Sequence, residues 1–167
     1  SEINVLTPIL LNFIKLMKKK HEDFIYVFHS TKEYKDLLYS HIKSSELTCC
    51  EVISDEKIKK HILQKSVFAI CKSGTVSLEI CSAKIPSIIL YKMGFINFFI
   101  IKMLVKIKYA NIINIAANEE IIPELLQSKC SAENIYKLVN IYLDNPEKIK
   151  KQLSKIQKIL DSFKTEK

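Results

Sequence analysis

A short polar stretch near the middle of the chain combines residue types that bind phosphate. Ser73, Gly74 and Thr75 follow an apolar run and open a segment with helical spacing. The first backbone N–H groups of a helix have no partner within the helix and attract anions. Glycine lets an anion approach the backbone closely, and the two hydroxyl groups add hydrogen bonds. The pattern therefore indicates a phosphate site, with an ordinary turn and helix cap as the alternative.

Glu79 lies one helical turn beyond Thr75, on the same face of the expected helix. If a nucleotide diphosphate occupied the start of this helix, its ribose would lie near the carboxylate. A carboxylate accepts hydrogen bonds from both ribose hydroxyls. We therefore expect Glu79 to hold a ribose, and the alternative is a solvated surface glutamate.

Strands that alternate with helices are expected to position these residues. Short runs rich in β-branched and aromatic residues predict strands at 24–28, 48–53, 67–70 and 88–91. Helical spacing predicts helices at 2–19, 31–42, 55–63 and 75–83. This alternation is typical of α/β proteins, in which helices cover both faces of a parallel sheet. Ligands gather at the carboxyl ends of such strands, where residues 73–75 lie.

The last part of the chain is predicted to be mainly helical. We expect helices at 95–105, 119–127 and 131–143, with a loop at 111–118 and Ser131 as an N-cap. Pro146 opens a final helix. Its apolar residues form one stripe, so we expect this helix to dock on another element. The stripe consists of Ile149, Leu153, Ile156, Leu160 and Phe163.

Composition narrows the class of protein. The 167 residues suit one domain, and 48% hydrophobic with 26% charged residues is typical of a globular protein. The formal net charge is +8, and all 26 basic residues are lysines. Because arginine is the residue that forks onto phosphates and guanine edges, its absence argues against nucleic acid as a partner. The excess of lysine favours other anionic partners, including a membrane face.

No metal site and no cofactor are expected. The five cysteines are odd in number and lack C-x-x-C spacing, and the four histidines show no ligand spacing. We expect reduced, buried thiols in a cytosolic protein and histidines with structural roles. These residues are Cys49, Cys50, Cys71, Cys81 and Cys130, with His21, His29, His41 and His61.

Several motifs, in their order and spacing, resemble the C-terminal half of lipid-A-disaccharide synthase. They are the run from Ser73 to Glu79, Pro86, 88–92, 104–106, Tyr109, Asn114 and 120–127. The resemblance extends from Ser1 to about Phe163. It implies a two-domain glycosyltransferase of the GT-B type, whose Rossmann-like C-terminal half holds a UDP-sugar donor.

The resemblance also implies a reaction and its site. The family transfers a sugar from UDP-2,3-diacylglucosamine to 2,3-diacylglucosamine 1-phosphate, with inversion and without a metal. Ser73, Gly74 and Thr75 are then expected to cradle the diphosphate, and Glu79 to hold the ribose. Four later residues are expected to line the donor pocket: Asn114, Glu120, Glu124 and Gln127. With no metal present, Lys72 or Lys92 can assist at the departing UDP, or both are simply two surface lysines among many.

Lipid substrates imply a cytoplasmic enzyme that is peripheral on the inner membrane. Residues 93–101 are apolar and aromatic, and lysines follow them. This pattern suits shallow insertion beneath anionic headgroups, and a helix packed within the protein is the alternative. The window 87–107 is interrupted by lysines, so it is not expected to span a bilayer. The residues expected to face the membrane are Phe95, Phe98 and Phe99.

The chain departs from the family pattern in two ways. Asn118 and Glu119 stand where the family has Gly-Arg, so donor binding is expected to weaken unless the Glu119 side chain turns away. The chain also begins with Ser1, and we expect the N-terminal half that binds the acceptor to be absent. We therefore predict a donor-binding domain at 1–145 and a C-terminal helix and tail at 146–167, inactive alone. The alternatives are a UDP-sugar-binding remnant without catalysis and a basic membrane-associated module.

Overall fold

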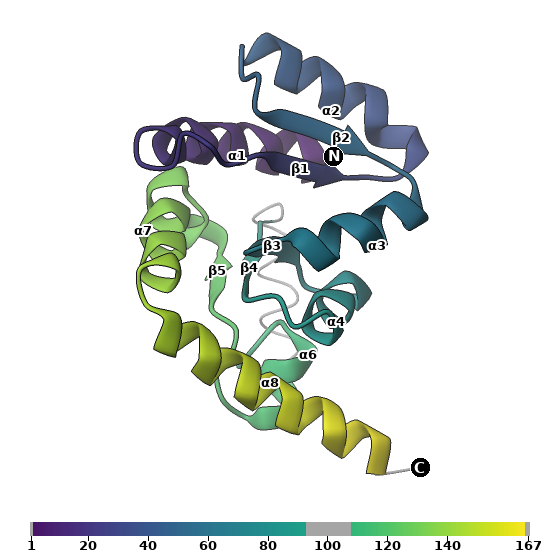
Figure 1. Cartoon of the computed structure of the whole chain (residues 1–167), viewed down its shortest axis with the longest axis vertical. Coiled ribbons are helices and arrows are strands. Elements are labelled where there is room, and N and C mark those ends of the chain that lie inside the picture. Colours follow the sequence, from purple (N-terminus) through teal and green to yellow (C-terminus); the bar gives the residue numbers. More distant parts are fainter. Residues whose placement is uncertain (1, 93–107, 166–167) are drawn as a thin grey trace. The chain divides into compact units, whose positions relative to one another are not determined.

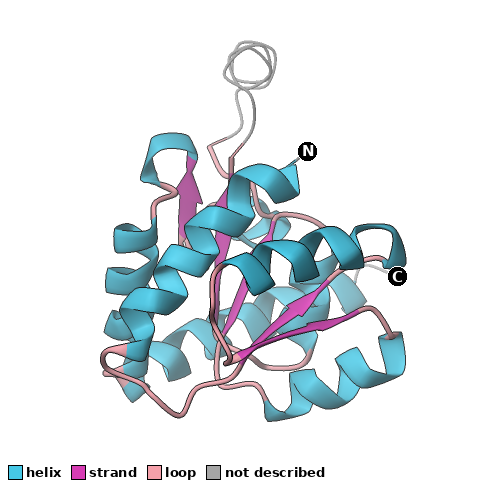
Figure 2. Cartoon of the chain, turned by 90° about the horizontal axis from the view of Figure 1, so that it is seen from above, coloured by secondary structure: helices cyan, strands magenta, loops and turns pink. Residues whose placement is uncertain are grey.

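The computed structural model describes residues 2–92 and 108–165 (Figure 1). The chain divides into two compact units, one formed by Ser1–Lys65 with Ser131–Tyr136 and the other by Ser66–Cys130 with Lys137–Lys167. In each unit helices flank a parallel sheet, and the C-terminal part is helical. The predicted α/β class is therefore confirmed. Figure 2 shows the strands of each sheet running in the same direction.

The first unit contains a two-stranded sheet. Its elements are α1 (Glu2–Lys18), β1 (Tyr26–His29), α2 (Lys32–Ser44), β2 (Cys50–Ile53) and α3 (Glu56–Lys65). Strand β1 pairs with β2, with Tyr26 opposite Cys50. The Phe13 ring of α1 packs edge-on against Tyr26, with 6.3 Å between ring centroids. An aromatic contact between helix and strand thus holds α1 on the sheet.

The second unit contains a three-stranded sheet in the order β3-β4-β5. Its elements are β3 (Ala69–Lys72), α4 (Thr75–Ser82), β4 (Ser87–Tyr91), α6 (Ile112–Ala117), β5 (Glu124–Leu126), the 3-10 turn η1 (Gln127–Lys129) and α8 (Pro146–Thr165). Helix α7 (Ala132–Leu143) has residues in both units. Ile88, Ile89 and Leu90 of the central strand are buried, which explains their uninterrupted apolar run.

Two of the predicted elements are wrong, and both lie between residues 111 and 127. The expected loop contains α6, because the Asn111 side chain accepts a hydrogen bond from Ile113 N at 2.9 Å and caps a helix. The expected helix at 119–127 instead contains β5. Here Ile89 N of β4 donates to Pro123 O at 2.9 Å, and the sheet pairing that follows outweighs local helical spacing.

Helix α8 docks on another element, as its apolar stripe predicts. It packs against α4 and α6, where Ile156 is buried and Ile149 and Leu153 are half-buried. Its polar residue Gln152 is buried as well, and the side-chain amide makes two hydrogen bonds to the backbone of Ser87. Gln152 Oε1 accepts from Ser87 N at 3.0 Å, and Nε2 donates to Ser87 O at 2.9 Å. One side chain thus joins α8 to the start of β4.

Replacing Gln152 with alanine is expected to lower the free energy of unfolding by about 2–4 kcal/mol, because it leaves the buried N–H and C=O of Ser87 unpaired. Urea denaturation followed by circular dichroism measures the loss. The control is Lys158→Ala at an exposed position of the same helix, for which we expect a change below about 0.5 kcal/mol. If Gln152→Ala lowers the free energy of unfolding no more than the control does, the two hydrogen bonds to Ser87 do not stabilise the docking of α8.

Candidate functional site

The predicted phosphate loop joins β3 to α4 in the second unit. Gly74 is the N-cap of α4 and has φ +142° and ψ −166°, a conformation open almost only to glycine. A Cβ built on Gly74 has no atom within 4 Å, so the space beside this residue is open. Gly74 and Thr75 are exposed, and Ser73 is half-buried. The loop therefore presents the first turn of α4 to solvent, as a phosphate site requires.

Hydroxyl groups fix this loop to the segment at residues 110 and 111. Ser73 Oγ donates to Ala110 O at 2.5 Å. Ser77 Oγ donates to Gly74 O at 2.6 Å and accepts from Asn111 Nδ2 at 2.9 Å. The loop conformation thus depends on side chains from α4 and from the N-cap of α6. Asn111 is not among the predicted site residues, although an asparagine before an apolar run is a recognisable N-cap signal.

Glu124 fixes the same segment from the other side. Its carboxylate accepts hydrogen bonds from Ala110 N, Asn111 N and Asn114 Nδ2, each at 2.8 Å. The residue is only 8% exposed. Hydrogen bonds to a carboxylate are stronger than those between neutral groups, so this junction is firmly held.

Asn114 is fully buried, with 0% of its surface exposed. Its Oδ1 accepts from Ile121 N at 2.8 Å and from Ile122 N at 2.9 Å. Its Nδ2 donates to Ile122 O at 2.7 Å and to the Glu124 carboxylate at 2.8 Å. Both lone pairs and both N–H groups of the amide are used within the protein. Asn114 therefore positions the segment that carries Glu120 and Glu124.

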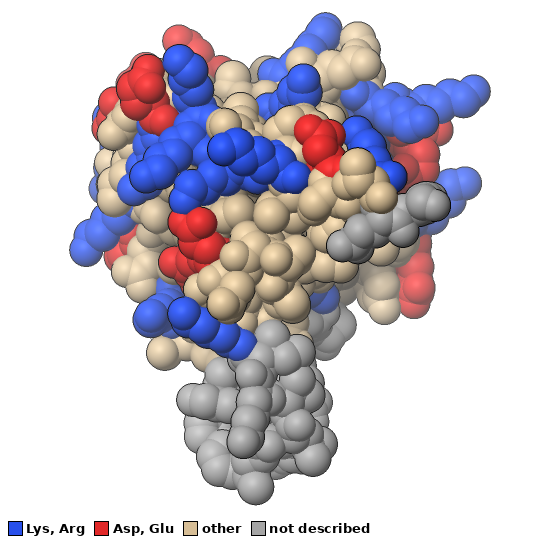
Figure 3. Space-filling model, turned by 90° about the horizontal axis from the view of Figure 1, so that it is seen from below, with Lys and Arg blue, Asp and Glu red and all other residues tan. Residues whose placement is uncertain are grey.

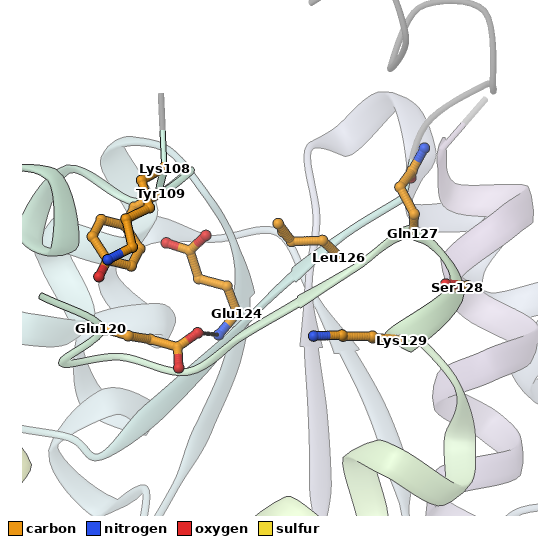
Figure 4. A pocket seen from close by; sticks show the side chains of 8 residues that line it. All are labelled: Lys108, Tyr109, Glu120, Glu124, Leu126, Gln127, Ser128 and Lys129. Carbon is orange, nitrogen blue, oxygen red and sulfur yellow. Dashed lines mark hydrogen bonds between the residues drawn. The ribbon is translucent and has the colours of Figure 1, made fainter. Parts of the chain in front are cut away.

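A pocket of about 570 Å³ opens beside this junction (Figure 4). It is lined by Lys108, Tyr109, Glu120, Glu124, Leu126, Gln127, Ser128 and Lys129. Three predicted residues, Glu120, Glu124 and Gln127, thus line the same pocket. Ser73, Gly74 and Thr75 do not line the pocket, but Ala110, which Ser73 contacts, follows Tyr109 directly. Glu79 is exposed on α4 and does not line the pocket either.

The pocket contains residues that the sequence did not reveal. Lys108, Ser128 and Lys129 are not among the predicted site residues, and Tyr109 contributes only to the resemblance. Ser128 and Lys129 reach the pocket because Gln127 has φ +50° and turns the chain at the end of β5. No local signal marks this turn, since the surrounding sequence has helical spacing.

Asn118 and Glu119, which stand where the family pattern has Gly-Arg, each have a defined role in the structure. Asn118 is the C-cap of α6 and has φ +49°, a left-handed conformation that asparagine tolerates better than most residues. Glu119 forms an ion pair with Lys155 of α8. The negative charge of Glu119 is thus partly balanced by a cation of α8. Figure 3, a view from the side on which α8 lies in Figure 1, shows many lysines interspersed with carboxylates.

Three of the histidines contact nearby side chains. His29 Nε2 lies 3.3 Å from Glu56, whose pKa is lowered chiefly by its hydrogen bond from Lys59. His41 contacts Asn4, and His21 stacks on Phe24. Within 2–92 and 108–165, no three His, Cys, Asp or Glu side chains gather closely enough to hold a metal ion.

The expected apolar helix at 95–105 and the residues Phe95, Phe98 and Phe99 lie outside the described residues. Their contact with a membrane stays a prediction. In the part of the chain that the structure describes, no helix has the length and apolar character needed to cross a membrane.

Residues 1–167 match the family model described as lipid-A-disaccharide synthetase. The lipid-A-disaccharide synthase of Persephonella marina is 36% identical over 166 residues, which cover 96% of this chain and 44% of the relative. The lipid-A-disaccharide synthase of Rickettsia bellii is 41% identical over 112 residues, which cover 67% of this chain and 29% of the relative. The lipid-A-disaccharide synthase of Rickettsia prowazekii is 32% identical over 157 residues, which cover 93% of this chain and 40% of the relative. The chain thus spans less than half the length of these relatives.

Proposed function

Because the chain belongs to the lipid-A-disaccharide synthetase family, we propose that it forms the UDP-sugar-binding half of a lipid-A-disaccharide synthase. The observation that carries this proposal is the family match over residues 1–167, joined to an open glycine loop at the start of α4. On this proposal residues 1–145 form the donor-binding domain and 146–167 a C-terminal helix and tail.

The proposed reaction forms a bond between two glucosamine units. A hydroxyl oxygen of 2,3-diacylglucosamine 1-phosphate attacks the anomeric carbon of UDP-2,3-diacylglucosamine, and the bond from that carbon to the UDP oxygen breaks. The configuration inverts, and the products are lipid A disaccharide 1-phosphate and UDP. A base outside this chain takes the proton of the attacking hydroxyl. Since the chain spans 44% of the relative from Persephonella marina, we propose that another polypeptide segment supplies the base and binds the acceptor.

Negative charge develops on the departing UDP, and the proposed site meets it with backbone N–H groups. We assign the diphosphate to Ser73, Gly74 and Thr75, where the first turn of α4 is exposed. The Ser73 hydroxyl already donates to Ala110 O, so its main contribution is to fix the loop. Glu79, one turn further along α4, is proposed to accept from the ribose hydroxyls. We propose that the pocket beside Glu120, Glu124 and Gln127 accommodates the donor from the diphosphate onward.

Because both proposed substrates are lipids, we propose that the enzyme works on the cytoplasmic side of the inner membrane as a peripheral protein. The formal net charge of +8 favours an anionic membrane surface. Phe95, Phe98 and Phe99 remain the residues proposed to enter the headgroup region. Liposome flotation tests this: changing the three phenylalanines to serine is expected to release the chain from vesicles that contain anionic lipid.

UDP is expected to raise the melting temperature of the 167-residue chain, because a ligand that binds only the folded state stabilises it. At UDP concentrations near 100 times Kd, the rise is expected to be roughly 5–10 °C. Glu79→Ala is expected to lose most of this rise, whereas Glu147→Ala, at an exposed position of α8, keeps it. If UDP leaves the melting temperature of the folded parent unchanged, the proposed function is wrong. If Glu79→Ala responds as the parent does, only the ribose assignment is wrong.

A second candidate function is a UDP-sugar-binding remnant without catalysis, which is consistent with a match to less than half of each relative. Both candidates predict UDP binding. They separate when the part of a relative that this chain does not match is supplied in trans, since only a working donor half restores transfer.

A further inference from the structure

The pocket beside β5 carries two lysines on opposite sides (Figure 4). Lys108 lies over the ring of Tyr109, with Nζ 5.2 Å from the ring centroid. Lys129 comes from η1, beyond the turn that the positive φ of Gln127 creates. Packing over an aromatic ring limits the conformations of Lys108, and a short 3-10 turn fixes the origin of Lys129. The two ammonium groups are therefore positioned by different structural elements.

The carboxylates of the pocket are held by N–H groups of the protein. Glu124 accepts three hydrogen bonds, two of them from the backbone N–H groups of Ala110 and Asn111. Glu120 accepts from Glu124 N at 3.4 Å. The negative charges thus lie along the wall formed by β5 and the segment before it, and the positive charges lie at its two flanks (Figure 4). Two lysines and two glutamates give the pocket a formal charge near zero, which lets it accept an anion without net repulsion.

The pocket and the predicted phosphate loop lie at the same edge of the sheet. Residues 73–75 follow the carboxyl end of β3, and residues 127–129 follow the carboxyl end of β5, at the same edge of the parallel sheet. With β4 between them and about 4.8 Å between neighbouring strands, the two ends are roughly 10 Å apart. A ligand of the size of a nucleotide sugar spans this separation. The volume of about 570 Å³ also falls within the range for small-molecule sites.

We propose that Lys108 and Lys129 form a phosphoryl-binding pair at this pocket. The ligand chemistry is a sugar that carries a phosphate: the phosphate pairs with the two ammonium groups, and the sugar hydroxyls donate to Glu120 or accept from Gln127. Because the chain contains no arginine, lysine has to supply this charge. The phosphate belongs either to a uridine diphosphate or to a sugar 1-phosphate. The assignment to uridine diphosphate rests on the proposed function. The lysine pair itself does not, because it is inferred from the geometry of the pocket.

The experiment compares ligands and variants by titration calorimetry at low salt. The ligands are UDP, uridine and glucosamine 1-phosphate, and the proteins are the parent, the double variant Lys108→Gln/Lys129→Gln and the control Lys158→Gln. We expect the double variant to bind either UDP or glucosamine 1-phosphate about tenfold more weakly than the parent does. Its binding of uridine is expected to be unchanged. Lys158→Gln loses one exposed charge of α8 outside the pocket and is expected to bind as the parent does. Circular dichroism confirms that each variant is folded.

The pattern of losses identifies the source of the phosphate. A loss for UDP assigns the pair to the nucleotide, and a loss for glucosamine 1-phosphate alone assigns it to a sugar 1-phosphate. If the parent binds UDP but neither ligand depends on the two lysines, the inference is overturned while the proposed function stands. If the parent binds only glucosamine 1-phosphate and this binding depends on the lysines, the inference stands and the proposed function falls. Binding of neither phosphorylated ligand overturns both.

Protection from chemical labelling locates the bound phosphate independently. Amine acetylation followed by mass spectrometry is expected to show slower labelling of Lys108 and Lys129 when the phosphorylated ligand is present. Labelling of Lys158 is expected to stay the same. Equal labelling of Lys108 and Lys129 with and without bound ligand would overturn the assignment even if the double variant bound more weakly.

Discussion

Replacing Asn114 with alanine is expected to lower the free energy of unfolding by about 3–5 kcal/mol, a larger loss than the one expected for Gln152→Ala. The substitution leaves Ile121 N, Ile122 N and Ile122 O without the partner that Asn114 provides. Each buried polar group without a partner costs about 1–3 kcal/mol. The measurement is urea denaturation of the variant and the parent at the same pH, followed by circular dichroism.

Asn145→Ala provides the matched control for this loss. The Asn145 side chain accepts one hydrogen bond, from Lys148 N at 3.1 Å, at the exposed start of α8. Loss of such a cap costs about 1 kcal/mol. If Asn114→Ala destabilises the protein no more than Asn145→Ala, then the buried amide does not hold the junction, and the positioning role of Asn114 is wrong.

Replacing Gly74 with alanine is expected to weaken UDP binding by at least about tenfold and to lower stability by about 1–3 kcal/mol. The cause is the backbone, because φ +142° with ψ −166° is strained for any residue that has a Cβ. A clash does not contribute, since no atom lies within 4 Å of the added Cβ. The loop relieves the strain by moving, and its N–H groups then no longer converge on the phosphate. Titration with UDP and thermal denaturation measure the two effects.

The exposed neighbour Val76 supplies the control for Gly74. Val76→Ala removes apolar surface that is 42% exposed and leaves the backbone conformation unaffected, so UDP binding is expected to stay within about twofold. If Gly74→Ala binds UDP as tightly as Val76→Ala, the glycine conformation is not needed for binding. The diphosphate would then have to lie elsewhere.

The elements that position the loop at residues 73–75 could be predicted because their signals are local. The apolar run at 88–91 corresponds to β4, and it reads as a strand because both its faces are covered. The helical spacing at 75–83 corresponds to α4, and a glycine before it marks its start. The stripe on the final helix likewise predicted its docking. In each case the residues that decide the structure lie within a few positions of one another.

The segment from 111 to 127 could not be predicted for the opposite reason. Strand β5 forms because Glu124 and its neighbours pair with β4, which lies far away in the sequence. Asn114 contacts residues 121, 122 and 124 through a side chain whose partners cannot be identified from spacing. The place of Lys129 in the pocket depends on the turn at Gln127. These features arise from tertiary contacts, and single-sequence patterns do not encode such contacts.

Hydrogen exchange with and without UDP tests the central claim most directly, namely that the backbone at the start of α4 binds the diphosphate. The claim predicts that saturating UDP slows exchange in the peptide that contains residues 73–77, with smaller effects in α3 and α8. Glu79→Ala, for which we expect weak UDP binding, is expected to show little of this protection. UDP that binds the folded chain but leaves exchange at 73–77 unchanged would contradict the claim.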